Sequence, residues 1–429
     1  MRINSKAAFL WDESFLWGLM AYEALKDNGL PFDLLRSDDI RNGVLKNYKM
    51  LFVPGGWASN KLKGLGDEGA KEIKSFVAGG GNYLGFCGGA GLATLDGIGL
   101  LDIKRRPTKD RVPSFSGRIN LNVNEHQIWG NKLDEDLPFN SKQGHIFHAW
   151  WPSQFLTPPI PPLGKGSIKI LAAYGHALPD AFSSDLCVGD VLRSKGNWIE
   201  LESFYNINLD PERLNGEPAV IEGRYGKGKV ILSLIHFDTP DDKSGHAVLR
   251  RLWEYFIDDG ATYPAPVETA SPAPRFTKRN PEAISGLLDT VSDLIELGKR
   301  NFLWFHRNPM LFQWRRGVRG LEYCTLYVLI EKIAVLLSFH SNSSRFASSD
   351  FNAQLTKIAE ILKPFCQKAK ELLILERLAL QNGHITYEKC DDAKIQELRT
   401  ELFSNSKSYG GLFKRLINRV DKLLYDLIK

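Results

Sequence analysis

The stretch Asn82-Tyr-Leu-Gly-Phe-Cys87-Gly-Gly-Ala-Gly-Leu-Ala-Thr94 changes from an apolar run to a run of small residues at a single cysteine. This pattern predicts a β-strand that turns directly into a helix, with Cys87 at the junction. Glycines on both sides let the backbone take the strained turn of a nucleophile elbow. The first N–H groups of the helix would favour a thiolate and an oxyanion. A buried structural cysteine in a glycine-rich turn is the alternative, and these residues alone leave both open.

The composition is typical of a folded protein. The chain has 429 residues, of which 43% are hydrophobic, enough for about two to four domains. It has no run of ~18 apolar residues, so no membrane span is expected. The apolar run that ends at Trp11 is too short for a signal peptide, and we expect a cytoplasmic protein. The five cysteines are widely spaced without a CxxC pair, which predicts neither a disulfide framework nor a metal site, and no cofactor is expected.

The positive charge is concentrated in one half of the chain. Residues 1–264 contain 30 Lys and Arg against 32 Asp and Glu, a net charge of −2, whereas residues 265–429 contain 25 against 18, a net charge of +7. A basic half can face an acidic partner or a nucleic acid. We interpret this excess as a solvated helical surface and do not expect nucleic-acid binding.

Residues 1–100 alternate short apolar runs with helical patterns. Strands are expected at 7–11, 32–35, 48–53 and 82–86, and helices at 15–28 and 67–78. This alternation predicts an α/β fold with a parallel sheet covered on both faces. Ligands bind such sheets at the carboxyl ends of the strands. Three loops reach that edge, namely 12–14, 54–57 and the Cys87 turn, and Asp12-Glu-Ser14 is expected to cap the first helix.

The rest of the chain suggests a second domain. Residues 101–215 give no clear topology apart from a strand at 168–174. Strands at 218–222 and 229–235 and a helix at 244–258 complete a first domain over 1–260. A Pro- and Ala-rich linker is expected at 261–281. Residues 282–429 carry apolar stripes at helical spacing and predict an all-α bundle of about four or five helices.

Two residues far along the chain are candidate catalytic partners of Cys87. A thiolate nucleophile needs a base within hydrogen-bond reach and a group that orients that base. His236 follows a predicted strand, and Asp238 is two residues further on, so both side chains can point the same way. The predicted strand places them at the same sheet edge as Cys87. The N–H groups of Gly55, Gly56 and Gly88 are the expected oxyanion donors, and Trp57 and Glu13 are the expected substrate-binding residues.

These residues resemble a known family. The matching segments are Phe52-Val-Pro-Gly-Gly56, Gly85-Phe-Cys-Gly-Gly-Ala90 and the run from Gly216 to Asp238. Together they resemble the class I glutamine amidotransferase-like superfamily, and most closely the N-terminal domain of biotin-protein ligases and its stand-alone bacterial relatives. The resemblance covers roughly residues 5–260. It implies a flavodoxin-like sheet and a Cys87–His236–Asp238 triad.

The sequence departs from the superfamily pattern at two places. Members that use glutamine usually have Gln three positions after the nucleophile, where this chain has Ala90. They usually have His-Pro-Glu where this chain has His236-Phe-Asp238. These differences argue against glutamine as the substrate. The biotinyl-adenylate motif of the GRGRxG type is absent and residues 282–429 are predicted as helices, so we do not expect a biotin ligase.

Three further motifs have simpler interpretations. His145 and His148 have metal-ligand spacing, but the surrounding residues predict a strand on which the two would face opposite ways. Tyr225-Gly-Lys-Gly228 lacks the context of a phosphate loop and predicts a hairpin turn. The basic loop from Lys104 to Arg111 is interpreted as solvated, with binding of an anionic substrate as the alternative.

Two functions remain open from the sequence. The first is a cysteine-dependent hydrolase or amidase that acts on an unknown small-molecule amide or ester. The second is a non-catalytic amidotransferase-like module that binds a ligand or a protein, with the helical domain as its interaction module. The sequence predicts neither the protein partner nor the oligomeric state.

Overall fold

The computed structural model describes residues 6–130, 145–156, 168–257, 282–339, 349–383, 386, 390–404 and 408–429. The chain separates into two compact units, residues 1–268 and 269–429. The predicted linker at 261–281 lies outside the described residues. Each unit is therefore described by itself.

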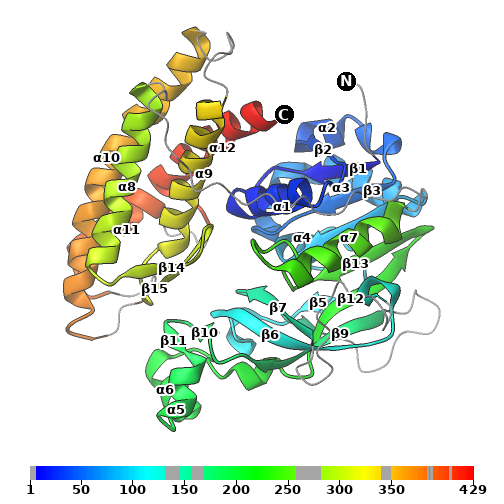
Figure 1. Cartoon of the computed structure of the whole chain (residues 1–429), viewed down its shortest axis with the longest axis horizontal. Helices are drawn as coiled ribbons and strands as arrows, with labels where there is room; N and C mark the ends of the chain where they lie inside the picture. Colours follow the sequence, from blue (N-terminus) through cyan, green and yellow to red (C-terminus); the bar gives the residue numbers. More distant parts are fainter. Residues whose placement is uncertain are drawn as a thin grey trace. The chain divides into compact units, whose positions relative to one another are not determined.

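The first unit is built on a sheet whose first half is parallel (Figure 1). Its strands are β1 (Ala7–Leu10), β2 (Asp33–Leu35), β3 (Met50–Val53), β4 (Asn82–Phe86) and β13 (Gly228–Ser233). They pair in the order β2-β1-β3-β4-β13, and every pairing in this run is parallel. The residues of β1 and β3 are buried throughout, as expected for strands covered on both faces. The α/β class predicted from the sequence is confirmed.

The second half of the sheet is antiparallel, which the sequence did not predict. It adds the strands β12 (Pro218–Tyr225), β9 (Lys169–Ala177), β6 (Phe115–Val123), β7 (His145–Trp150), β10 (Phe182–Ser183) and β11 (Leu186–Cys187). Strand β12 joins the two halves because it pairs with β13 through the hairpin turn predicted at Tyr225–Gly228. Among the described residues, β5 (Lys104–Arg105) and β8 (Phe155–Leu156) form a separate two-stranded sheet.

The described residues of the first unit form the three helices predicted at 15–28, 67–78 and 244–258, with different ends, the short helix after Cys87, and three helices that the sequence did not predict. These helices are α1 (Leu16–Asp27), α2 (Ser37–Arg41), α3 (Ala58–Ala78), α4 (Gly88–Leu92), α5 (Val188–Arg193), α6 (Trp198–Tyr205) and α7 (Lys243–Ile257). Helix α3 begins nine residues before the predicted start, and its backbone leaves helical geometry at Gly66. The predicted cap of α1 is wrong, because its N-cap residue is Phe15 and no side chain caps it. The Asp12 carboxylate instead accepts hydrogen bonds from Arg36 and from the Ser37 amide.

The second unit is helical, as predicted, but it also contains a β-hairpin. Its helices are α8 (Glu282–Arg300), α9 (Gly320–Phe339), α10 (Ser349–Ala379), α11 (Ala393–Phe403) and α12 (Gly411–Ile428). The antiparallel strands β14 (Trp304–Asn308) and β15 (Leu311–Trp314) lie between α8 and α9. The expectation of helices alone is therefore wrong for this segment. None of the helices in the described ranges is long and apolar enough to span a membrane.

Candidate active site

Cys87 occupies the strained turn that the sequence predicts. Its backbone has φ 47° and ψ −102°, a conformation that L side chains rarely adopt and that requires support from its surroundings. The support comes from hydrogen bonds, because the Cys87 amide donates to Ser233 O (2.8 Å) and Cys87 O accepts from the Gly91 amide (2.9 Å). The Cys87 side chain remains partly exposed. The following helix α4 has only five residues.

The glycines after Cys87 are required by close contact with the loop after β3. A Cβ atom on Gly88 would lie 2.0 Å from Gly56 O, and one on Gly89 would lie 1.9 Å from Val53 O. Neither position has room for a side chain. The buried Tyr83 hydroxyl donates to Gly89 O (2.7 Å) and fixes the first turn of α4 against the sheet. The two predicted loops therefore meet in the structure.

His236 and Asp238 form a buried pair beside this turn. Asp238 Oδ1 lies 2.9 Å from His236 Nδ1, and both side chains are fully buried. The register places them there, because β13 pairs in parallel with β4 and Ser233 lies opposite Phe86. The Trp17 ring packs against the His236 ring, with 4.8 Å between their centroids. His236 Nε2 is buried and has no hydrogen-bond partner among the described residues.

The pKa of His236 reflects its burial and two neighbouring side chains. Burial lowers the pKa, but the charge and hydrogen bond of Asp238 and then the Cys87 side chain raise it, to about 10. A carboxylate next to an imidazole favours the imidazolium in this way. Cys87 lies beside the end of the strand that leads to His236, since its amide donates to Ser233 O, and no described residue makes a hydrogen bond to His236 Nε2. Catalytic hydrogen bonds are often long or poorly aligned until substrate binds.

The expected oxyanion donors face the same turn. A Cβ atom on Gly55 would lie 3.1 Å from His236 Cε1. Gly56 has φ 118°, in the region that favours glycine. None of the described residues accepts a hydrogen bond from the amides of Gly55, Gly56 or Gly88. Three free amides therefore lie on the loops that meet at Cys87.

The two expected substrate-binding residues lie on neighbouring loops. Trp57 is the half-buried N-cap residue of α3. Glu13 has φ 55°, and its backbone oxygen would lie 2.5 Å from a Cβ atom on Gly56. Lys61, which the sequence does not mark as a site residue, is almost fully buried, and its ammonium contacts Ser14 Oγ and Asp12 O. A lysine in an amphipathic helix gives no sequence signal for such burial.

The basic loop after α4 is not simply solvated, which corrects the favoured interpretation of the sequence. Arg105, Arg106 and Arg111 are each half-buried. Arg106 forms an ion pair with Glu217 (2.9 Å). Arg111 Nη1 donates a hydrogen bond to the buried Ser153 Oγ (2.6 Å).

The pair His145 and His148 lies on strand β7, as predicted. His148 Nδ1 lies 2.7 Å from Asp242 Oδ2, and its ring stacks on Trp150. Within the described ranges, no group of three or more His, Cys, Asp or Glu side chains is arranged to hold a metal ion.

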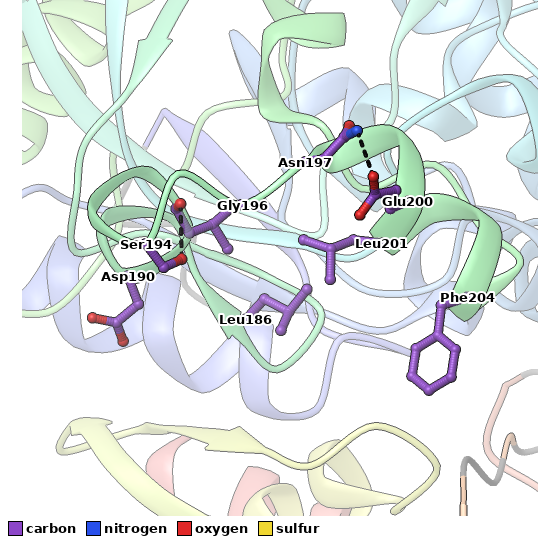
Figure 2. Close-up of a pocket in the computed structure, with 9 residues that line it drawn as sticks. Leu186, Asp190, Ser194, Gly196, Asn197, Glu200, Leu201 and Phe204 are labelled. Carbon is purple, nitrogen blue, oxygen red and sulfur yellow. Dashed lines mark hydrogen bonds between the residues drawn. The ribbon is translucent and has the colours of Figure 1, made fainter.

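A pocket of about 560 Å³ lies away from these residues, between β11, α5 and α6 (Figure 2). It is lined by Leu186, Asp190, Val191, Ser194, Gly196, Asn197, Glu200, Leu201 and Phe204. Asn197 and Glu200 are hydrogen-bonded to one another at its rim, and the Phe204 side chain is 68% exposed. This pocket contains none of the site residues predicted from the sequence.

Comparison with known proteins confirms the resemblance over one segment. Residues 43–96 match the family described as "Biotin-protein ligase, N terminal". This segment contains Gly55, Gly56 and Cys87, whereas His236 and Asp238 lie beyond it. No curated protein sequence matches the chain.

Several solved structures are similar to the chain at low identity. The PurLQS structure from Thermotoga maritima is 15% identical, with a TM-score of 0.37 over 59% of this chain and 99% of that chain. A Thermoplasma acidophilum protein described as a GMP synthase component is 12% identical, with a TM-score of 0.36 over 59% and 94%. A β-galactosidase from Bacillus circulans sp. alkalophilus is 14% identical, with a TM-score of 0.33 over 58% of this chain and 31% of that chain.

Proposed function

We propose that the first domain, residues 1–260, is a cysteine-dependent amidase or hydrolase, with Cys87 as nucleophile, His236 as base and Asp238 as the residue that orients the base. One observation carries the proposal: a fully buried His–Asp pair adjoins a partly exposed cysteine whose φ is 47°. Strained backbone concentrates at functional sites. The amides of Gly55, Gly56 and Gly88 donate to none of the described residues, and they would stabilise the oxyanion that forms in the reaction.

The reaction follows from these groups. The Cys87 thiolate attacks the carbonyl carbon of an amide or ester, and the carbonyl π electrons move to the oxygen, which the glycine amides stabilise. The C–N or C–O bond then breaks, and the leaving amine or alcohol takes a proton from the His236 imidazolium. A thioester on Cys87 remains. Water, deprotonated by His236, attacks the thioester and releases the carboxylic acid and the thiolate.

Asp238 controls the orientation and the protonation of the His236 ring. Its hydrogen bond to Nδ1 leaves Nε2 as the nitrogen that exchanges a proton with Cys87 and with the leaving group. Its charge also favours the imidazolium, which in turn stabilises the thiolate. The proposed helical domain at 282–429 would bind a partner or shape access to the substrate.

Alkylation with iodoacetamide near neutral pH tests this function in the full-length protein. The proposal predicts that Cys87 reacts much faster than the other four cysteines, and that His236→Ala removes the difference. Cys324 and Cys366 are buried, and burial raises the pKa of each thiol to about 12, so these two should react slowly. Cys187 and Cys390 are partly exposed and serve as internal references. Equal rates for Cys87 and these references would instead support the non-catalytic binding module.

A further inference from the structure

Among the described residues, Arg111 is a half-buried cation without a carboxylate partner. Its Nη1 donates to Ser153 Oγ (2.6 Å) and its Nη2 donates to Thr108 Oγ1 (3.3 Å), and both acceptors are neutral. Its Nε is buried and has no hydrogen-bond partner among the described residues. No described carboxylate lies within salt-bridge distance of the guanidinium. A charge that leaves water without an opposite charge lowers stability, so a counter-ion is expected here.

A second cation lies nearby. The Arg105 guanidinium covers Gly91, because a Cβ atom there would lie 2.8 Å from Arg105 Nη1. Asp96, the acid nearest to Arg105 among the described ion pairs, is 3.7 Å from its Nε and is itself 41% exposed. Burial and then the charge of Arg105 lower the pKa of Arg111, whereas Cys87 raises it. The Gly91 amide donates to Cys87 O (2.9 Å), so the Arg105 guanidinium lies over the first turn of α4, which begins beside Cys87.

The surrounding structure holds Arg111 in place. Ser153 and Gln154 are buried, and Gln154 Oε1 accepts a hydrogen bond from the Val112 amide (3.2 Å). Gln154 O accepts from the Arg106 amide (2.8 Å). The loop is thus fixed at both ends against the segment after β7. A preorganised guanidinium loses little freedom when it binds an anion.

We infer that Arg111, together with Arg105, binds an anionic oxygen group, carboxylate or phosphate, of the molecule whose reactive carbonyl lies at Cys87. The guanidinium offers donors in a fixed planar geometry that suits either group. The inference rests on the proposed function for the identity of the reactive group, but the anion site itself exists independently of catalysis. The substrate class becomes an acidic amide or ester.

Two alkylating agents of matched size test the site. Iodoacetate carries a carboxylate and iodoacetamide is neutral, and each reacts by the same displacement of iodide to form a thioether. Any effect of Arg111 on the thiolate itself cancels in the ratio of the two rates. We expect the iodoacetate-to-iodoacetamide ratio at Cys87 to exceed that at Cys187 by about tenfold, as one charge-assisted contact implies.

Three variants distinguish a specific contact of the anion with Arg111 from a general effect of the positive charge on this loop. Arg111→Gln should lower the ratio at Cys87 by about tenfold, while Arg111→Lys should retain part of it. Arg106→Gln removes a cation of the same loop that already pairs with Glu217, so it should leave the ratio unchanged. An unchanged ratio in a folded Arg111→Gln protein would overturn the inference while leaving the proposed function intact.

A binding measurement that needs no nucleophile completes the test. Calorimetric titration of the full-length Cys87→Ser variant with succinate and, separately, with inorganic phosphate should detect binding of at least one anion. Arg111→Gln in the same background should abolish it. If Cys87 labels slowly with both reagents but this binding is present, the anion site stands and the proposed function fails. Absence of binding for both anions, with no preference for iodoacetate, overturns the anion site.

Discussion

His236 Nδ1 and Asp238 Oδ1 are 2.9 Å apart in a site where both side chains are fully buried. In this arrangement the carboxylate accepts a hydrogen bond from Nδ1–H and its charge favours the imidazolium. Asp238→Asn should keep the side-chain volume but lose the charge that raises the pKa of His236. We expect the rate of Cys87 alkylation by iodoacetamide to fall by at least about tenfold. Mass spectrometry of the labelled cysteines measures this rate.

Asp242→Asn is the matched control for that substitution. Asp242 pairs with His148 at 2.7 Å, so it has the same His–Asp chemistry, and neither residue has a proposed catalytic role. Its removal should leave the Cys87 rate unchanged. Equal losses in the two variants would mean that Asp238 acts only on the fold.

The charge state of His236 is a separate prediction. Because the pKa of His236 is raised to about 10, its ring should remain an imidazolium at pH 8, where an ordinary histidine is neutral. The bound proton stabilises the folded state fully below about pH 6.5, and this contribution is lost as the pH rises through about 10. Nitrogen NMR of the histidine-labelled protein reports the protonation of each ring nitrogen. His176, whose side chain is 69% exposed, supplies a reference signal.

Asp238→Asn should also shift this titration to lower pH, since the Asp238 charge and hydrogen bond are the main contributions that raise the pKa. A His236 ring that is already neutral at pH 7 in the wild-type protein would contradict the prediction. It would also remove the imidazolium from the proposed mechanism, leaving a neutral base that must take the proton from the thiol.

The contact between the turn at Cys87 and the loop after β3 predicts that one added methyl group has a large effect on stability. A Cβ atom on Gly89 would lie 1.9 Å from Val53 O, and backbone on both sides prevents an easy shift. Gly89→Ala should lower the free energy of unfolding of the first unit by about 1–3 kcal/mol or more. Denaturant titration followed by tryptophan fluorescence measures the change.

Gly64→Ala provides the comparison, because a Cβ atom there would meet its nearest neighbour at 3.7 Å, an ordinary contact. Gly64 lies inside helix α3, where alanine is favoured over glycine by about 0.5–1 kcal/mol. The same substitution should therefore have opposite effects at the two positions. A destabilisation of equal size at both would show that the close approach at Gly89 is not the cause.

The sequence predicted those parts of the fold that depend on neighbouring residues. The apolar run of β4 and the glycines after Cys87 form a local pattern, and the spacing of His236 and Asp238 needs only a strand end. The antiparallel half of the sheet depends instead on distant pairing, such as Leu121 with Tyr174. No local pattern specifies such a partner. Gly55 and Gly56 could be assigned to the site from the sequence only because the carboxyl ends of parallel strands meet at one edge of the sheet.

Buried charged side chains are the second feature that the sequence does not predict. Arg111 belongs to a run of charged residues, which predicts a solvated loop, yet Ser153, 42 residues further along the chain, accepts its hydrogen bond. The hairpin at Trp304–Trp314 was missed for a related reason. Its apolar residues Leu311 and Phe312 are adjacent and both buried, so they do not alternate as strand residues on a half-exposed sheet do.

A buried ion pair in the helical unit gives a prediction that is independent of catalysis. Glu376 Oε1 accepts a hydrogen bond from Arg399 Nε (2.8 Å), and both side chains are at least 95% buried. Burial raises the pKa of Glu376 to about 7, although Arg399 opposes the shift. The folded state therefore binds a proton that the unfolded state has released, and the stability of this unit should fall as the pH rises from about 4.5 to 7.

Hydrogen exchange of the α10 and α11 amides in the full-length protein, corrected for the intrinsic effect of pH, measures this fall. Glu376→Gln keeps an acceptor for Arg399 but has no proton to lose, so protection in these helices should become nearly independent of pH over this range. Glu401→Gln removes an exposed carboxylate of α11 that contacts Lys368, and the fall should persist in that variant. Persistence of the full fall in Glu376→Gln would show that another group controls it.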